Sequence, residues 1–205
     1  NKIENYLFED ISFNSEIFSD VVRVEDGEQL MNLIQDSYNN YGIEETAIIV
    51  RSNKRANLYN RAIRDKILNN ENIITVGDLL MVVKNNYFWL NNKKDLGFIA
   101  NGDIIKIEEI HNIKNIYGFK FAEVKISMVD YPNISPLETV LILDSLFINT
   151  PAIDFNTMNN LYHEILKDFM NVKTKYKRHM GVKNNKFFNA LQVKFAYSFT
   201  CHKSQ

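Results

Sequence analysis

The stretch that decides the fold closes the sequence: Leu191-Gln192-Val193-Lys194-Phe195-Ala196-Tyr197-Ser198-Phe199, followed directly by Thr200-Cys201-His202-Lys203-Ser204-Gln205. The first part is mainly apolar and aromatic and contains neither Gly nor Pro, which predicts a strand. The second part is small and polar, and it stands where a parallel-sheet protein turns from a strand into a helix. Because ligands of such sheets bind at the carboxyl ends of the strands, we expect a ligand site at residues 200–205.

Upstream, residues 1–72 alternate strand and helix patterns, which is typical of an α/β fold. The segment Asp26-Gly27-Glu28-Gln29 has the form of a capping box and predicts that a helix follows. Residues 46–50 form a continuous apolar run, as expected of a strand buried on both faces of a parallel sheet. Residues 52–69 predict a second helix, with apolar side chains spaced for one face.

The middle of the chain, residues 73–146, has a different pattern. Four β-rich runs, at 79–83, 103–110, 119–129 and 137–143, are separated by Asn, Gly, Asp and Pro. They predict a small antiparallel barrel inserted between two α/β segments, 1–72 and 147–205. In the last segment, residues 158–169 have helical spacing, and a basic loop from Lys173 to Lys186 leads into the final strand.

Composition sets the class of protein. The 205 residues are 45% hydrophobic and 24% charged, with a net charge of -1, so a nucleic-acid site would have to come from local basic clusters. A single cysteine excludes an internal disulfide framework and fits a reducing compartment, so we expect a cytoplasmic protein. No apolar run has the length of a membrane span. The sequence begins with Asn1 and stops within a motif, which suggests a piece of a longer protein.

Three local clusters are candidates for binding. Arg51-Ser52-Asn53-Lys54-Arg55 follows the run at 46–50 and opens a helix, a position suited to phosphate; the alternative is a capped helix with solvated basic residues. Tyr87-Phe88-Trp89 offers rings for stacking single-stranded bases, although such runs are more often core. The basic stretch 173–186 suits a nucleic-acid backbone or a solvated loop equally.

Other chemistries are excluded by residue type. Gly97 to Gly102 has the glycine spacing of a P-loop, but Asp103-Ile104 stands where Lys and Ser/Thr are needed, so the chain has no ATPase loop of its own. The four histidines are scattered and, with one cysteine, give no metal spacing. Cys201 and His202 are adjacent, so on a strand they would point to opposite faces and form no nucleophile pair.

Taken in order, these motifs resemble superfamily-one helicases of the RecD/UvrD type. Residues 200–205 match the fifth motif, Thr-x-His-Lys-Ser/Ala-Gln, and stop before its Gly. Arg51 and Asn53 match the fourth, a strand followed by Arg-x-Asn and a helix; Asn60 and Arg64 match its structural continuation. Gly77-Asp78-Leu79-Leu80-Met81, an Asn-rich turn and Asn101-Gly102-Asp103 match the barrel that RecD-like members carry.

The resemblance implies the second motor lobe of an ATP-dependent DNA helicase: an α/β, RecA-like parallel-sheet lobe interrupted by a small antiparallel β-barrel. It implies movement on single-stranded DNA, from 5′ to 3′, with ATP and Mg²⁺ held mainly by the first motor lobe of the same protein and none held by this chain alone. Arg51 would be catalytic, contacting the γ-phosphate, with Asn53, Lys203 and Gln205 on the nucleotide side; Thr200 and His202 would contact DNA. The alternative is a non-catalytic single-strand-binding or adaptor module.

Overall fold

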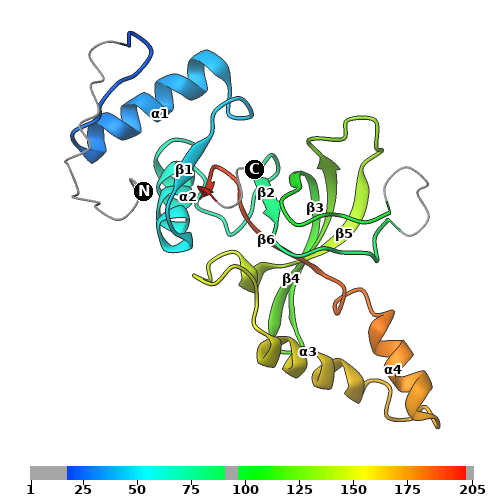
Figure 1. Cartoon of the computed structure of the whole chain (residues 1–205). Coiled ribbons are helices and arrows are strands. Elements are labelled where there is room, and N and C mark those ends of the chain that lie inside the picture. Colours follow the sequence, from blue (N-terminus) through cyan, green and yellow to red (C-terminus); the bar gives the residue numbers. More distant parts are fainter. Residues whose placement is uncertain (1–17, 91–96, 202–205) are drawn as a thin grey trace, which may run out of the picture. The chain divides into compact units, whose positions relative to one another are not determined.

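The computed structural model describes residues 18–90 and 97–201 (Figure 1). By its internal contacts the chain divides into two compact units, Asn1–Thr46 and Ala47–Gln205. In the described part of the first unit, helix α1 spans Gly27–Tyr41, and its N-cap Asp26 accepts a hydrogen bond from the Gln29 backbone N–H at 2.8 Å. The helix predicted after Asp26 is therefore confirmed, and its side chains Ile34 and Tyr38 are buried.

The second unit begins with a strand, β1 (Ile48–Val50), and a helix, α2 (Asn53–Lys66). Strand β1 pairs in parallel with β7 (Ser198–Thr200), at the far end of the described chain, to form a sheet of two strands. Helix α2 buries Ala56, Asn60, Ile63 and Arg64. Two of these four side chains are polar, and both hold α2 to other segments, as described below.

The second unit also contains a closed barrel of five strands in the order β2-β3-β4-β5-β6 (Figure 1). Its strands are β2 (Leu79–Val82), β3 (Ile104–Ile116), β4 (Phe119–Met128), β5 (Leu137–Ile142) and β6 (Leu191–Phe195). Neighbouring strands are antiparallel, except that β5 and β6 run parallel. Each strand carries apolar side chains that are almost or fully inaccessible: Leu80, Ile105, Ile107, Val124, Ile126, Leu141 and Val193.

The β3–β4 hairpin extends past the barrel, because both strands are longer than their partners β2 and β5. Its turn is Tyr117-Gly118, both with positive φ (56° and 78°), the conformation of a tight two-residue hairpin loop. A short 3₁₀ turn, Leu143–Ser145, follows β5, and then two helices, α3 (Phe155–Lys167) and α4 (Lys175–Lys183). These helices share an apolar cluster with the hairpin, centred on Phe121, Leu161, Ile165, Val182 and Phe187.

The predicted fold class is wrong. The described residues form a five-stranded mixed barrel and a two-stranded parallel sheet, with no RecA-like parallel-sheet lobe. The run at 191–199 was expected to be one strand of a large parallel sheet, but it divides at Ala196-Tyr197. Its first half, β6, joins the barrel beside β2 and β5; its second half, β7, pairs with β1. The strand that closes the barrel thus comes from outside residues 73–146.

Two local predictions are also wrong. Residue Ile49 is 55% exposed, so the run at 46–50 is not buried on both faces; among the described strands, β7 is the one partner of β1. The basic segment 173–186 contains helix α4 where a loop was expected. Its apolar side chain Val182 is fully buried in the cluster with α3. This burial stabilises a helix in a segment whose other side chains are mainly basic or polar.

Candidate functional site

The candidate site lies where β1, β7 and α2 meet. In the parallel pair, Val50 stands opposite Thr200, so both strands end at the same edge. The chain leaves β1 through Arg51 into α2, whose N-cap Ser52 accepts a hydrogen bond from the Arg55 backbone N–H at 3.3 Å. Two segments that are far apart in the sequence are therefore neighbours at one sheet edge, as is usual for the carboxyl ends of parallel strands.

The charge around the start of α2 is unusual for a helix. Its first turn has no acidic residue, while Arg51, Lys54 and Arg55 are all exposed there. Cations at a helix N-terminus oppose the helix dipole and cost about 0.3–1 kcal/mol each, so this arrangement does not serve the stability of α2. It does suit an anion, because N-terminal backbone N–H groups and basic side chains both favour negative charge.

A small cavity of about 20 Å³, lined by both polar and apolar residues, lies under this edge. Asn53 and Thr200, which the family resemblance assigns to different ligands, both line it. Ser198 also lines it, and its buried hydroxyl has no hydrogen-bond partner among the described residues.

Lys194 also lines this cavity, and the sequence analysis missed it. Its side chain is 5% exposed, and Nζ donates to the Ile148 carbonyl oxygen at 2.5 Å. Burial lowers the pKa of the Lys194 ammonium to about 8. The sequence signal for Lys194 was the alternation of apolar and polar residues at positions 191–195. Gln192 and Lys194 share one face of β6, and both bond to the segment that follows the 3₁₀ turn.

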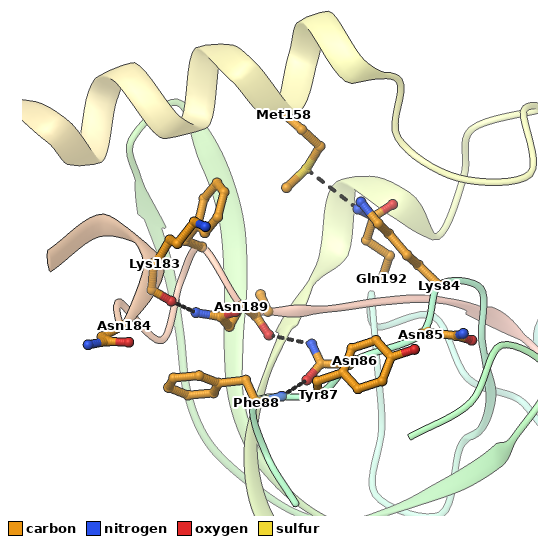
Figure 2. Close-up of a pocket in the computed structure, with 12 residues that line it drawn as sticks. Lys84, Asn85, Asn86, Tyr87, Phe88, Met158, Lys183, Asn184, Asn189 and Gln192 are labelled. Atoms are coloured by element: carbon orange, nitrogen blue, oxygen red, sulfur yellow. Dashed lines mark hydrogen bonds between the residues drawn. The ribbon is translucent and has the colours of Figure 1, made fainter. Parts of the chain in front are cut away.

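A larger pocket, of about 400 Å³, lies beside the barrel (Figure 2). The three aromatic residues predicted to stack on bases, Tyr87, Phe88 and Trp89, have different surroundings. Tyr87 and Phe88 line the pocket, and Tyr87 is 59% exposed. Trp89 instead packs against the apolar cluster of the hairpin, and its Nε1 donates to the Asn189 carbonyl oxygen at 2.8 Å. One aromatic of the run is therefore structural, while Tyr87 is available to a ligand.

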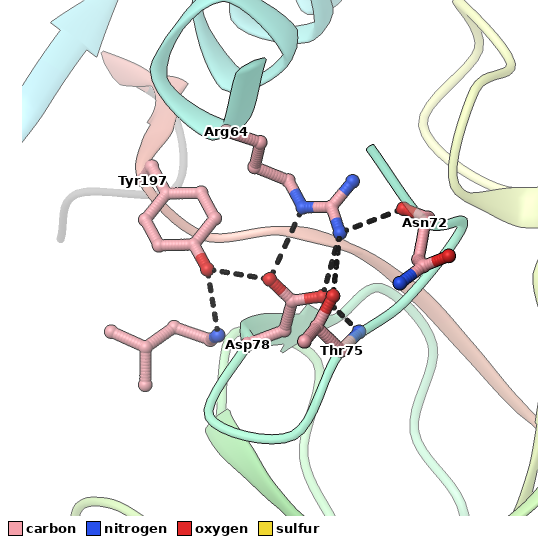
Figure 3. Close-up of polar contacts among 6 residues, drawn as sticks. Arg64, Asn72, Thr75, Asp78 and Tyr197 are labelled. Carbon is pink, nitrogen blue, oxygen red and sulfur yellow. Dashed lines mark hydrogen bonds and ion pairs between the residues drawn. The ribbon is translucent and has the colours of Figure 1, made fainter. Parts of the chain in front are cut away.

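A buried ionic network fixes α2 to the barrel (Figure 3). Arg64 donates to Asp78 from Nε at 3.1 Å and from Nη2 at 3.0 Å, and the guanidinium carbon lies 4.3 Å from the centre of the Phe195 ring. The Tyr197 hydroxyl donates to Asp78 at 2.8 Å; burial and the Asp78 charge raise the pKa of that hydroxyl. Thr75 adds a backbone N–H at 2.7 Å.

Asn60 makes a second connection from α2. Its amide nitrogen donates to the carbonyl oxygens of Phe195 and Ser198, each at 3.0 Å, and its oxygen accepts from the Ser198 backbone N–H at 2.7 Å. One side chain therefore satisfies the backbone at both sides of the break between β6 and β7. Asn60 and Arg64 have the structural roles that the motif resemblance implies.

The predicted site residues stand as follows. Arg51 is exposed at the β1 edge, and Asn53 and Thr200 line the cavity beneath it. His202, Lys203 and Gln205 lie outside the described residues. Within residues 18–90 and 97–201 there is no group of three or more His, Cys, Asp or Glu side chains that could hold a metal ion, and no helix long and apolar enough to cross a membrane.

In comparisons with known proteins, no protein-family model and no curated protein matches this sequence. The assignment of a function therefore depends on the motifs and on the geometry of the edge that brings them together.

Proposed function

We propose that this chain is part of an ATP-dependent DNA helicase that moves along single-stranded DNA from 5′ to 3′, and that the edge formed by β1, β7 and the start of α2 is its nucleotide- and DNA-facing surface. The observation that carries the proposal is the parallel pairing of Val50 with Thr200. By this pairing Arg51, in the segment that resembles a fourth helicase motif, follows the strand that lies beside Thr200, where the segment that resembles the fifth motif begins. The two segments are far apart in the sequence.

The chemistry at the edge supports both ligands. The cationic start of α2 suits the terminal phosphate of a nucleotide, where Arg51 would stabilise charge that develops during phosphoryl transfer. The Thr200 hydroxyl suits a backbone phosphate oxygen of DNA, a contact that does not depend on base sequence. Because β1 and β7 are hydrogen-bonded neighbours, a displacement at one ligand would be passed to the other.

Hydrolysis itself requires parts that the printed sequence does not contain. ATP with Mg²⁺ would supply the free energy for movement, held by a Gly-x-x-x-x-Gly-Lys-Ser/Thr loop elsewhere in the complete protein. This chain would contribute Arg51 to the transferring phosphate, Asn53 to the nucleotide side, and the Thr200 edge to DNA.

The test uses the complete gene product. We expect it to contain a P-loop, and we expect Arg51→Ala to lower ATP turnover about 100-fold or more while single-strand binding stays within a few-fold. Lys66→Ala is the matched control, since Lys66 is also an exposed cation of α2 but lies at the other end of the helix. Absence of a P-loop, or equal turnover in both variants, would refute the proposal.

A non-catalytic module that binds single-stranded nucleic acid is the second candidate, and the pocket beside the barrel favours it. There Tyr87 is exposed and stacks on Phe98, with 4.9 Å between the ring centres. A complete gene product that binds single strands but has neither a P-loop nor ATPase activity would establish this second function.

A further inference from the structure

The pocket beside the barrel is a separate site from the β1–β7 edge. Its walls come from three segments: residues 84–88 after β2, Met158 on α3, and residues 183–192 between α4 and β6. No residue of the edge lines it. Its volume of about 400 Å³ falls in the range of small-molecule sites, roughly 300–1,000 Å³.

The walls of this pocket are held in place by hydrogen bonds between the segments (Figure 2). The Asn86 amide donates to the Asn189 carbonyl oxygen at 2.9 Å, and the Asn189 amide donates to the Lys183 carbonyl oxygen at 2.6 Å. Asn86 also accepts from the Phe88 backbone N–H at 3.0 Å. A pocket formed in advance loses less conformational entropy when a ligand binds than one that must be ordered by the ligand.

The charges on the described residues that line the pocket are all positive. Lys84 and Lys183 are both exposed, and neither forms an ion pair with any residue in the described ranges. No Asp or Glu is among the lining residues that the structure describes. Two ammonium groups with no acidic partner among these residues favour a phosphate-bearing ligand over a neutral sugar.

The uncharged lining suits a nucleobase. Asn85 and Asn184 are exposed amides, although the Asn85 oxygen already accepts from the Asn101 backbone N–H at 2.7 Å, so Asn85 offers a base its N–H₂ group. The Gln192 amide donates to the Met158 sulfur at 3.5 Å, a weak acceptor that a ligand oxygen would replace. Tyr87 and Phe88 supply aromatic faces. Amides can donate to and accept from the polar edge of a base, while the rings stack on its face.

A second ring platform continues outward from the pocket. Tyr87 lines the pocket and also stacks on Phe98, which is 37% exposed. A base bound in the pocket would therefore have a neighbouring aromatic surface for the next base of a strand. We propose that this pocket binds one nucleotide unit of a single-stranded nucleic acid, with its base against Tyr87 and Phe88 and the flanking phosphates at Lys84 and Lys183. The inference deepens the second candidate function, which names the same pocket, and it does not depend on the proposed helicase activity.

The test is fluorescence anisotropy of the purified 205-residue chain with a labelled oligothymidylate of roughly ten nucleotides, within the usual site sizes of about 4–16. We expect Tyr87→Ala to weaken binding about tenfold, the lower part of the range for one stacked base. The double variant Lys84→Ala/Lys183→Ala should reduce the slope of log K against log salt by about 1.4, or about 0.7 for each phosphate contact.

Tyr41→Ala and Lys66→Ala are matched controls, because Tyr41 is 72% exposed on α1 and Lys66 is exposed at the end of α2. Both should bind as the unsubstituted chain does, and circular dichroism should show all variants folded. No binding by the unsubstituted chain, or equal binding by Tyr87→Ala and Tyr41→Ala, overturns the inference. So does competition by thymidine monophosphate as tight as that by the oligonucleotide, which would identify a free nucleotide as the occupant.

The pocket and the β1–β7 edge share no lining residue, so this inference and the proposed function can fail separately. Failure of strand binding by the 205-residue chain would leave the ATPase test of the complete gene product unaffected. Failure of the ATPase test, by contrast, leaves the binding result standing.

Discussion

Replacing Asp78 with Asn should destabilise the second unit by about 3–5 kcal/mol, the usual cost of removing one partner of a buried ion pair. Asp78 is 1% exposed and accepts four hydrogen bonds, two from Arg64 and one each from Thr75 and Tyr197. An amide in its place keeps the shape but sets an N–H₂ group against N–H or O–H donors. It also leaves the Arg64 guanidinium buried without a counter-charge.

Two further variants distinguish the loss of the buried Asp78 charge from the loss of a single hydrogen bond. Tyr197→Phe removes one hydroxyl from the network and should cost only about 1–2 kcal/mol. Glu109→Gln removes an ion pair at the surface, between Glu109 and Lys125, and should leave the stability nearly unchanged because solvent screens the pair. We therefore expect the loss of stability to decrease in the order Asp78→Asn, Tyr197→Phe, Glu109→Gln, because the burial of the lost interaction decreases in the same order.

Urea unfolding followed by tryptophan fluorescence measures this directly, because the single tryptophan, Trp89, packs against the apolar cluster of the second unit. With an m-value of about 2 kcal/mol/M, a loss of about 4 kcal/mol lowers the midpoint by about 2 M. Arg64→Met combined with Asp78→Asn should cost less than the sum of the two single changes. A midpoint for Asp78→Asn equal to that of Glu109→Gln would refute the reasoning.

Three further predictions concern other parts of the chain. Burial lowers the pKa of Lys194 to about 8, so between about pH 8 and pH 10 the unfolded chain holds a proton that the folded chain has lost. The free energy of unfolding should therefore rise with pH in this window, by about 1–2 kcal/mol relative to Lys194→Met. Urea titrations of both proteins at several pH values measure this difference. Gly181→Ala should destabilise by about 1–2 kcal/mol despite alanine's helix propensity, because an added Cβ would lie 2.5 Å from the Phe169 ring, whereas Gly27→Ala, with open space around it, should not. The 205-residue chain alone should release no phosphate from ATP above the blank, since it has no P-loop lysine; steady turnover by a contaminant-free preparation would contradict this.

The barrel strands could be predicted because their signals are local. The β-rich runs at 79–83, 103–110, 119–129 and 137–143 contain the strands β2 to β5 to within a few residues, apart from the extension of β3 to Ile116. Asn101-Gly102 and Gly118 mark turns where the backbone needs positive φ. The strand order could not be predicted, since pairing depends on contacts between segments that are distant in sequence.

The segment that contains β6, the strand that closes the barrel, illustrates this dependence on distant contacts. Residues 191–199 contain no Gly or Pro, so local pattern gives no reason to divide them. The division at Ala196-Tyr197 comes from long-range bonds: the Ala196 backbone N–H donates to the Leu79 carbonyl oxygen at 2.9 Å, and Tyr197 turns toward Asp78. The buried Lys194 was missed for the same reason, because its partner Ile148 belongs to a segment whose position only the folded chain defines.

The neighbouring edge at Arg51 and Thr200 was predictable in part. The sequence predicts Arg51 and Thr200 each at the carboxyl end of a strand, and both residues lie at such ends. The direct pairing of β1 with β7 in a sheet of two strands was not predicted. The pocket beside the barrel was not predictable from pattern. Its lining joins residues 84–88 with 183–192, and only Tyr87 and Phe88 carried a recognisable signal.

Because its last strand, β6, runs directly into β7, the barrel cannot be excised or transferred as the continuous segment 73–146, either in evolution or in the laboratory. The barrel is completed by residues 191–195, more than forty positions after β5 ends. A gene segment encoding only residues 73–146 would leave β2 and β5 with open edges, which are prone to aggregation. Exchange of the barrel between proteins would therefore have to carry residues 191–195 with it, and a deletion of the barrel would remove the strand that leads into Thr200.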